Sequence, residues 1–237
     1  MAISRAAPAC DAGIVDHRVE TAQKKREQMR ARILDATTRV FARDNAAAPA
    51  IEDVVREAGI SRGSFYNHFH SLDEALVAAG IEMSDRMISD IVPLYDFLRE
   101  PWQRAAVGFR LYLLRAWQDP TWASFMTRMD AWPHKSRIAV TMSKDLIRGK
   151  KLGQFDFDDA TVATDFLMGA SIGVIQAVRC GVPDPGSYID SAVRMALQSL
   201  GCSPELRERA VAFSRKRLAD CASGKRAAWD ILDPGGH

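Results

Sequence analysis

The sequence predicts an all-α protein in which a small N-terminal three-helix domain precedes a larger helical domain. Apolar residues recur at helical spacing along the chain, and Ser, Pro and Gly stand where helices would begin or end. No alternating apolar run of useful length is present, and no Asn-Gly or Asp-Gly pair offers a hairpin turn. With 237 residues and 47% hydrophobic residues, the chain can bury a substantial core.

Charge and cysteine content narrow the classes of function only slightly. The net charge is +2, but the basic residues between Arg18 and Arg43 outnumber the acidic ones by eight to three. This local excess suits an anionic partner, although a solvated helix face explains it equally well. The four cysteines form no C-x-x-C pair and have no zinc-like histidine spacing, so we expect reduced thiols, no metal and no cofactor.

We expect a cytoplasmic protein with no membrane partner. The N-terminus lacks the apolar segment of a secretion signal. The longest run without a charge spans 166–178, and 13 residues cannot cross a bilayer.

Residues 1–23 have no apolar period and are predicted to be a flexible arm. Residues 24–72 contain the small domain, whose first helix starts at Lys24 and ends before "DNAAAPA". A second helix covers "IEDVVREAG", and Gly59 suits the position just after its end. Ser61 is a good cap for a third helix, which carries Phe65 and Phe69 inward. The capping box "SLDE" then opens a longer helix that we expect to stop at Pro93.

The remaining chain, residues 73–222, is predicted to form one helical domain, followed by a loose tail at 223–237. Proline at helix starts and Gly or Pro at helix ends divide the rest of it into segments. The expected helices are 101–118, 121–131, 135–148, 158–179, 187–200 and 204–221.

The stretch "GISRG" matches the G-x-S-x-G pattern of a hydrolase nucleophile elbow, with Ser61 as the nucleophile. An elbow needs a strand before the serine, and here the preceding segment is an amphipathic helix. The same residues fit a helix-turn-helix, in which two short helices are joined by a tight turn containing Gly59. The second helix would then present its N-terminal residues to the major groove of DNA.

Residues 26–80 resemble the N-terminal domain of TetR-family transcriptional repressors. The matching run is "ARILDATTRVFARDN…IEDVVREAGISRGSFYNHFHSLDEAL". The resemblance implies a recognition helix on "SRGSFYNHF", a linking helix directly after it, and a C-terminal domain for ligand binding and dimerisation.

The resemblance also implies which residues contact DNA. It places Arg62, Ser64 and Asn67 at base-facing positions, and Ser61, Tyr66 and His68 along the backbone or groove. The full predicted set is Lys24, Lys25, Arg26, Ser61, Arg62, Gly63, Ser64, Tyr66, Asn67 and His68. Packing against the linking helix is the alternative for Tyr66 and His68.

The chain departs from the family pattern at three places. Asp44 and Asn45 stand where a glycine usually follows the first helix, Ala50 replaces a hydroxyl cap, and Leu72 replaces a common lysine. The last two changes put two phosphate contacts in doubt.

The segment 158–179 carries two apolar stripes, so it must be buried on both sides. We predict that it forms a homodimer interface with the following helix, because a two-fold dimer doubles the contact with a palindromic site. The predicted interface residues are Val162, Phe166, Gly169, Gly173, Ala177, Ile189, Val193, Ala196 and Leu200. The alternative is that both helices are ordinary monomer core.

An aromatic-rich block between the linking helix and that interface suits a mainly apolar, possibly aromatic ligand. The predicted ligand-binding residues are Trp102, Phe109, Tyr112, Trp117, Trp122, Phe125, Met126, Met129, Trp132 and Phe166. Core packing is the simpler role for any one of them.

The sequence therefore predicts a non-enzymatic, dimeric repressor that a small apolar ligand releases from a palindromic double-stranded DNA operator. A second interpretation keeps the DNA binding without a small-molecule ligand. A serine hydrolase using Ser61 is the third, and the chain has no H-E-x-x-H, Walker A or G-x-G-x-x-G motif.

Overall fold

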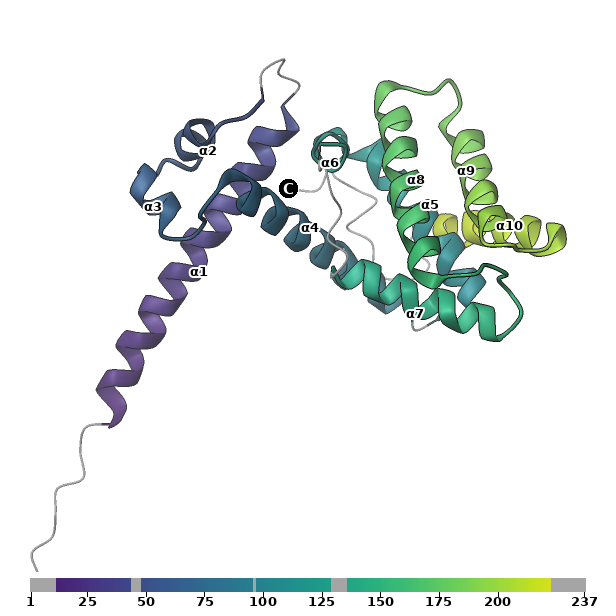
Figure 1. The fold of residues 1–237 in the computed structure, drawn as a ribbon, viewed down its shortest axis with the longest axis horizontal. Helices are drawn as coiled ribbons and strands as arrows, with labels where there is room; N and C mark the ends of the chain where they lie inside the picture. The colour runs from purple at the N-terminus through teal and green to yellow at the C-terminus, as the bar shows by residue number, and fades with distance from the viewer. Residues whose placement is uncertain (1–11, 44–47, 96, 129–135, 223–237) are drawn as a thin grey trace, which may run out of the picture.

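The computed structural model describes residues 12–43, 48–95, 97–128 and 136–222, and these residues form helices and no strand. The all-α prediction is therefore confirmed for the described part of the chain. Figure 1 shows a small group of helices, α1 to α3, joined through α4 to a larger bundle. The helices are α1 (Ala12–Ala42), α2 (Ile51–Ala58), α3 (Arg62–Tyr66), α4 (Leu72–Tyr95), α5 (Pro101–Gln118), α6 (Pro120–Met126), α7 (Arg137–Lys151), α8 (Ala160–Cys180), α9 (Pro185–Ser199) and α10 (Pro204–Ala222).

Helix α1 begins at Ala12, so residues 12–23 are helical rather than part of a flexible arm. Its N-terminal half projects past α3 as an isolated rod (Figure 1). The side chains from Val19 to Gln28 are all exposed, and Gln23 donates a hydrogen bond to Glu27 one turn later, at 2.8 Å. A segment exposed on all sides needs no apolar period, so the apolar pattern of the sequence does not reveal that the helix extends this far.

The three N-terminal helices close around a small core. Ile33, Ala36, Val54 and Phe65 are fully buried there. Arg39 of α1 donates to Glu57 of α2 at 2.7 Å, which ties the first two helices together at the surface.

Helix α4 links this domain to the bundle (Figure 1). Its N-terminal half buries Ala75 and Ala79, and its C-terminal half buries Ile88 and Ile91. The helix continues through Pro93 to Tyr95, beyond the predicted stop. A proline removes one amide donor, and so close to the C-terminus that loss does not end the helix.

In the larger domain, α5 lies at the centre and contacts α7, α8, α9 and α10. Among the described helices, α8 alone is long and apolar enough to cross a membrane by length and composition. It packs in the bundle against α5, α6, α7 and α9, as a core helix of a folded domain does.

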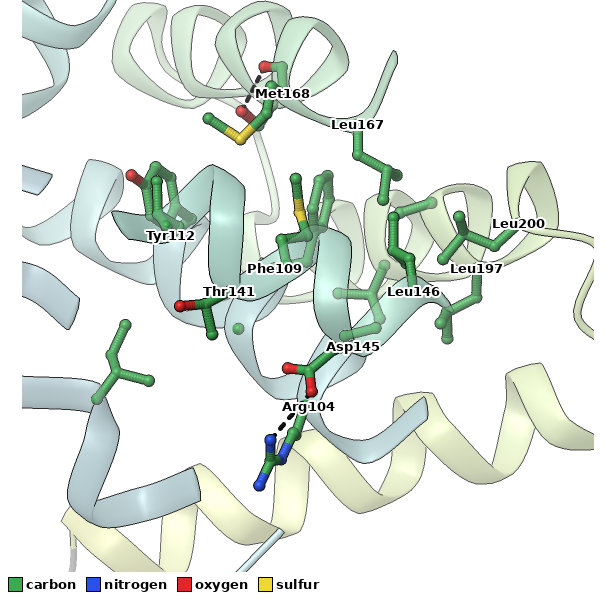
Figure 2. Close-up of a pocket in the computed structure, with 18 of the residues that line it drawn as sticks. Arg104, Phe109, Tyr112, Thr141, Asp145, Leu146, Leu167, Met168, Leu197 and Leu200 are labelled. Atoms are coloured by element: carbon green, nitrogen blue, oxygen red, sulfur yellow. Dashed lines mark hydrogen bonds and ion pairs between the residues drawn. The ribbon is translucent and has the colours of Figure 1, made fainter. Parts of the chain in front are cut away.

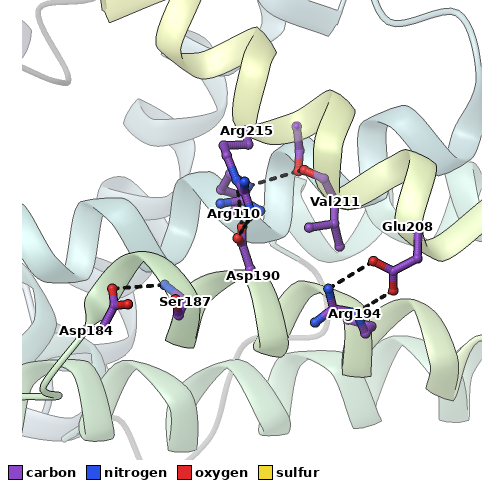
Figure 3. A network of polar contacts seen from close by, with 9 residues as sticks. Arg110, Asp184, Ser187, Asp190, Arg194, Glu208, Val211 and Arg215 are labelled. Atoms are coloured by element: carbon purple, nitrogen blue, oxygen red, sulfur yellow. Dashed lines mark hydrogen bonds and ion pairs between the residues drawn. The ribbon is translucent and has the colours of Figure 1, made fainter.

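A buried charge network holds α5, α9 and α10 together (Figure 3). The Arg110 side chain is only 5% exposed, and it pairs with Asp190 of α9 and donates to the Ser214 hydroxyl of α10 at 2.9 Å. Arg215 of α10 reaches the other Asp190 oxygen. Burial, and then the nearby Arg215 charge, lower the pKa of Arg110 to about 10, so it stays charged at neutral pH.

Candidate DNA interface and ligand cavity

The turn between α2 and α3 depends on Gly59. Its φ of 60° lies in the left-handed region, where residues with a side chain are strained. Its amide donates to the Arg56 carbonyl at 3.2 Å, and the next amide, from Ile60, donates to Val55 at 3.1 Å. These bonds end α2 and redirect the chain into α3, which makes the helix-turn-helix predicted from the sequence.

Ser61 caps α3, as predicted. Its hydroxyl oxygen accepts a hydrogen bond from the Ser64 amide at 3.1 Å and lies 2.9 Å from the Ser64 hydroxyl. The hydroxyl suggested as a hydrolase nucleophile is therefore part of a helix cap, and a helix rather than a strand precedes it.

Phe65 and Phe69 fix the orientation of α3. They are 0% and 2% exposed, and their ring centroids lie 5.9 Å apart. Because these two positions face inward, the other side chains of α3 lie outward. Ser61, Arg62, Gly63, Tyr66 and Asn67 are exposed, and Ser64 and His68 are half-buried.

Arg62 is held by two neighbours. One guanidinium nitrogen lies 2.8 Å from a carboxylate oxygen of Glu52 on α2, and the guanidinium stacks 5.8 Å from the ring centroid of Tyr66. A hydrogen bond with Tyr66 and the charge of Glu52 raise the pKa of Arg62. Sequence reasoning missed Glu52, because only the turn geometry brings α2 against the start of α3.

Basic residues of α1 flank the same surface. Lys24, Lys25 and Arg26 are exposed on the projecting half of α1. Burial, followed by the nearby charges of Arg26 and Arg30, lowers the pKa of His68. The Arg30 guanidinium lies 5.4 Å from the ring centroid of Phe69, which places this part of α1 beside the end of the recognition helix. Of the three departures from the family pattern, Asp44 and Asn45 lie outside the described residues.

The other two departures lie at helix starts. The backbone amide of Ala50 donates a hydrogen bond to the Asp53 carboxylate at 3.0 Å, which satisfies that amide, whereas Ala50 has no polar side chain to cap the first turn of α2. Leu72 is half-buried and packs against the core.

The larger domain contains a cavity of about 80 Å³. Most of its walls are hydrocarbon (Figure 2). Five helices contribute to them, including the C-terminal half of the linking helix α4. The lining residues include Ile91, Tyr95, Phe109, Tyr112, Thr141, Met142, Leu146, Leu167, Met168 and Leu197.

Two of the predicted ligand-binding residues, Phe109 and Tyr112, line this cavity. Trp122 lies behind Tyr112, with ring centroids 5.3 Å apart, and Trp102 packs on Phe213 at 5.3 Å. Phe125 and Met126 are buried core residues, Trp117 is 53% exposed and Phe166 is 59% exposed. None of these six lines the cavity. Met129 and Trp132 lie outside the described residues.

One end of the cavity is polar. Arg104 of α5 and Asp145 of α7 form an ion pair there at 3.0 Å (Figure 2). The guanidinium also donates to the carbonyls of Leu98, at 2.8 Å, and Tyr95, at 3.3 Å. Sequence reasoning did not find this pair, because its members are 41 residues apart.

Helix α8 has one buried and one open apolar stripe. Leu167 and Val178 of the inner stripe are 5% and 4% exposed, whereas Val162 and Phe166 of the outer stripe are 67% and 59% exposed. Gly169 and Gly173 continue the outer stripe, and no other helix of the described chain comes within 4 Å of where a Cβ would stand. Ala177, the last predicted residue on this helix, is half-buried.

The predicted interface residues of α9 lie mostly inside the protomer. Ile189, Val193 and Leu200 are at most 1% exposed, and Ala196 is half-buried and lines the cavity. Apolar spacing identifies a buried face of a helix but cannot tell whether the same chain or a second copy covers it. The exposed apolar residue of α9 is Met195, at 71%.

Comparison with known proteins agrees with this geometry. Residues 33–79 match the family model described as bacterial regulatory proteins, tetR family, and residues 100–208 match the tetracyclin repressor-like, C-terminal domain. The HTH-type transcriptional regulator AlkX of Mycobacterium tuberculosis is 28% identical over 149 residues, which cover 62% of this chain and 70% of AlkX.

Solved structures show the same fold. RolR in complex with the ligand resorcinol superposes with a TM-score of 0.65 at 22% identity, covering 81% of this chain and 95% of that one. A gamma-butyrolactone receptor, an ArpA-like protein, gives 0.53 at 16% identity, covering 83% and 98%. With both halves matched by models of one family and the helix-turn-helix in place, the chain belongs to the TetR family of DNA-binding transcriptional regulators.

Proposed function

We propose that this protein is a dimeric repressor, bound to a palindromic operator and released from it by a small, mainly apolar ligand. The observation that carries the proposal is the course of α4. This helix starts three residues after Phe69, which anchors the recognition helix, and Ile88, Ile91 and Tyr95 near its other end line the cavity. A ligand in the cavity therefore touches the element that positions the helix-turn-helix.

Release requires the ligand to favour one arrangement of α4 over another. A ligand that binds the DNA-free state more tightly lowers DNA affinity by the ratio of its two affinities. By the same linkage, the protein bound to DNA must bind the ligand more weakly than the free protein does, by the same factor. A regulator without a small-molecule ligand remains the alternative, and a mainly apolar cavity lined in part by α4 argues against it.

The first experiment identifies the operator. Selection of bound duplexes from a random pool, at stated salt, is expected to enrich a palindrome. A thermal-shift screen of small effectors then follows, with resorcinol and gamma-butyrolactones among the first compounds, since relatives of this fold are described with them. A ligand that binds at saturation without changing operator affinity would contradict the release mechanism.

For the dimer, we propose the open stripe of α8, with Met195 of α9 beside it. An apolar face of this kind is costly to leave in water and gains free energy from a second copy. The substitution Phe166→Glu is expected to convert the dimer to a monomer in sedimentation velocity and to weaken palindrome binding. Leu152→Glu alters a side chain of similar exposure, 54%, on the loop that follows α7, and serves as the control that should stay dimeric.

A further inference from the structure

The ion pair at the polar end of the cavity has a free acceptor. Asp145 uses one carboxylate oxygen for Arg104, and its other oxygen accepts no hydrogen bond from any residue in the described ranges. The carboxylate lines the cavity together with Phe109 and Leu146, and Figure 2 shows it next to Arg104. One turn earlier on α7, the Thr141 side chain lines the same space.

Arg104 is fixed by acceptors from the protein itself. Three of its N–H groups are engaged with Asp145 and with the carbonyls of Tyr95 and Leu98. The guanidinium also lies 5.3 Å from the ring centroid of Tyr95. It balances the charge of Asp145, and these two are the charged side chains among the described residues that line the cavity. The Arg148 charge also acts on Asp145, from outside the lining.

The charge balance and the size of the cavity restrict the ligand. A second anion would face the Asp145 carboxylate at low dielectric, and a cation would compete with Arg104 for it. A neutral hydrogen-bond donor satisfies the free oxygen without adding a charge. The cavity of about 80 Å³ is small, which favours a compact ligand such as one ring with a substituent.

We infer that the cavity binds a neutral single-ring molecule bearing a hydroxyl group, and that Asp145 accepts the hydrogen bond from that hydroxyl. The ring would lie among Phe109, Tyr112 and the adaptable side chains of Met142 and Met168. Burial raises the pKa of Asp145 and Arg104 opposes that rise, as expected for a carboxylate placed to meet a donor inside the domain. This inference rests on the proposed ligand site.

The test compares two probes of equal size. Phenol and toluene have the same number of non-hydrogen atoms, and only phenol can donate a hydrogen bond. Without an acceptor in the cavity, toluene should bind more tightly, because burying an unpaired hydroxyl is unfavourable. With Asp145 as the acceptor, we expect calorimetry or dye displacement on the full-length protein to show phenol binding at least tenfold more tightly than toluene, and benzoate more weakly than phenol.

Substitutions test whether Asp145 is the residue that accepts the hydrogen bond. Asp145→Asn keeps the size of the side chain and should reduce the phenol-to-toluene preference at least fivefold. Lys144→Gln changes an exposed side chain of α7 outside the cavity and should leave the preference within twofold. Ala105→Leu fills the cavity and should remove binding of both probes, and it tests the location even where Asp145→Asn destabilises the fold.

Equal or tighter binding of toluene by the wild-type protein would overturn the inference, as would an unchanged preference in Asp145→Asn. Failure of the proposed release mechanism gives a different result: phenol binds with the expected preference, but its binding leaves operator affinity unchanged. If no probe binds, the assigned ligand class is wrong, and operator selection still tests the DNA-reading function by itself.

Discussion

Arg62, the first residue of the recognition helix, forms an ion pair with Glu52 of the preceding helix at 2.8 Å. Glu52 is acidic and exposed, and it lies on the surface proposed to meet the polyanion. With the Tyr66 ring on the other side, it holds the guanidinium in one place. We interpret Glu52 as a residue that positions Arg62 for base recognition.

This interpretation predicts a selective effect of Glu52→Gln. An exposed pair of this kind contributes roughly 0.2–1 kcal/mol, so discrimination at the base read by Arg62 should fall by a few-fold at most. The measured quantity is the affinity ratio between the selected operator and its single-base variants. Removing a negative charge also raises affinity for every sequence, and that general rise cancels in the ratio.

A double-mutant cycle gives the decisive comparison. Arg62→Ala should itself cost about 1–3 kcal/mol at one base position if the contact is bidentate, and Glu52→Gln should then have no further effect on the ratio. Asp73→Asn removes an acidic charge from the start of α4 and is the matched control. A Glu52 effect that persists without Arg62 would assign Glu52 a general electrostatic role instead.

The projecting half of α1 is predicted to contact phosphate through Lys24 and Lys25. Replacing both with glutamine should weaken binding to all sequences alike. It should also reduce the slope of log K against log salt by roughly 0.9 for each phosphate that the variant no longer neutralises. Lys216→Gln, on α10 in the other domain, should leave the slope unchanged. The same slope in the Lys24/Lys25 variant would show that this part of α1 stays away from the DNA.

Operator affinity should rise as the pH falls, through His68. Burial and the charges of Arg26 and Arg30 lower its pKa in the free protein. A phosphate beside these arginines would cancel their effect and raise the pKa in the complex. The complex would then bind a proton that the free protein does not, so binding tightens as the pH falls from about 7.5 towards about 5.5.

The variant His68→Gln should lose this pH dependence, as measured by anisotropy titrations at constant ionic strength. His70→Gln, two residues away and exposed, provides the comparison. A pH dependence that survives in His68→Gln would place His68 among the residues that only pack against the linking helix.

The Arg110–Asp190–Arg215 network should contribute far more to stability than exposed pairs do. Asp190→Asn leaves the Arg110 charge buried without its counter-ion, and losing one partner of a buried pair costs about 3–5 kcal/mol. Glu208 pairs with Arg194 at 2.5 Å on the surface of the same two helices, α9 and α10, and Glu208→Gln should cost less than about 1 kcal/mol. Urea unfolding at one fixed protomer concentration measures both; equal losses would contradict the structural role of the network.

The sequence by itself determined the helices that have local signals and the helix-turn-helix. The cap at Ser61, the left-handed turn at Gly59 and the inward pair Phe65 and Phe69 all lie within eleven residues. Local hydrogen bonds and one apolar period specify that geometry, so a contiguous stretch contains all the information for it. The family resemblance covers residues 26–80, which include this stretch. The N-terminal family model matches residues 33–79, and a second model matches the larger domain.

The tertiary structure alone decided which residues meet across the fold. The cavity is formed by α4, α5, α7, α8 and α9, so neither Asp145 nor Arg104 carries a sequence signal that connects it to Phe109. Leu167 and Phe166 are equally apolar neighbours, yet one faces the core and the other faces solvent. Apolar spacing determines that a helix face is buried, but the packing of distant helices determines what buries it.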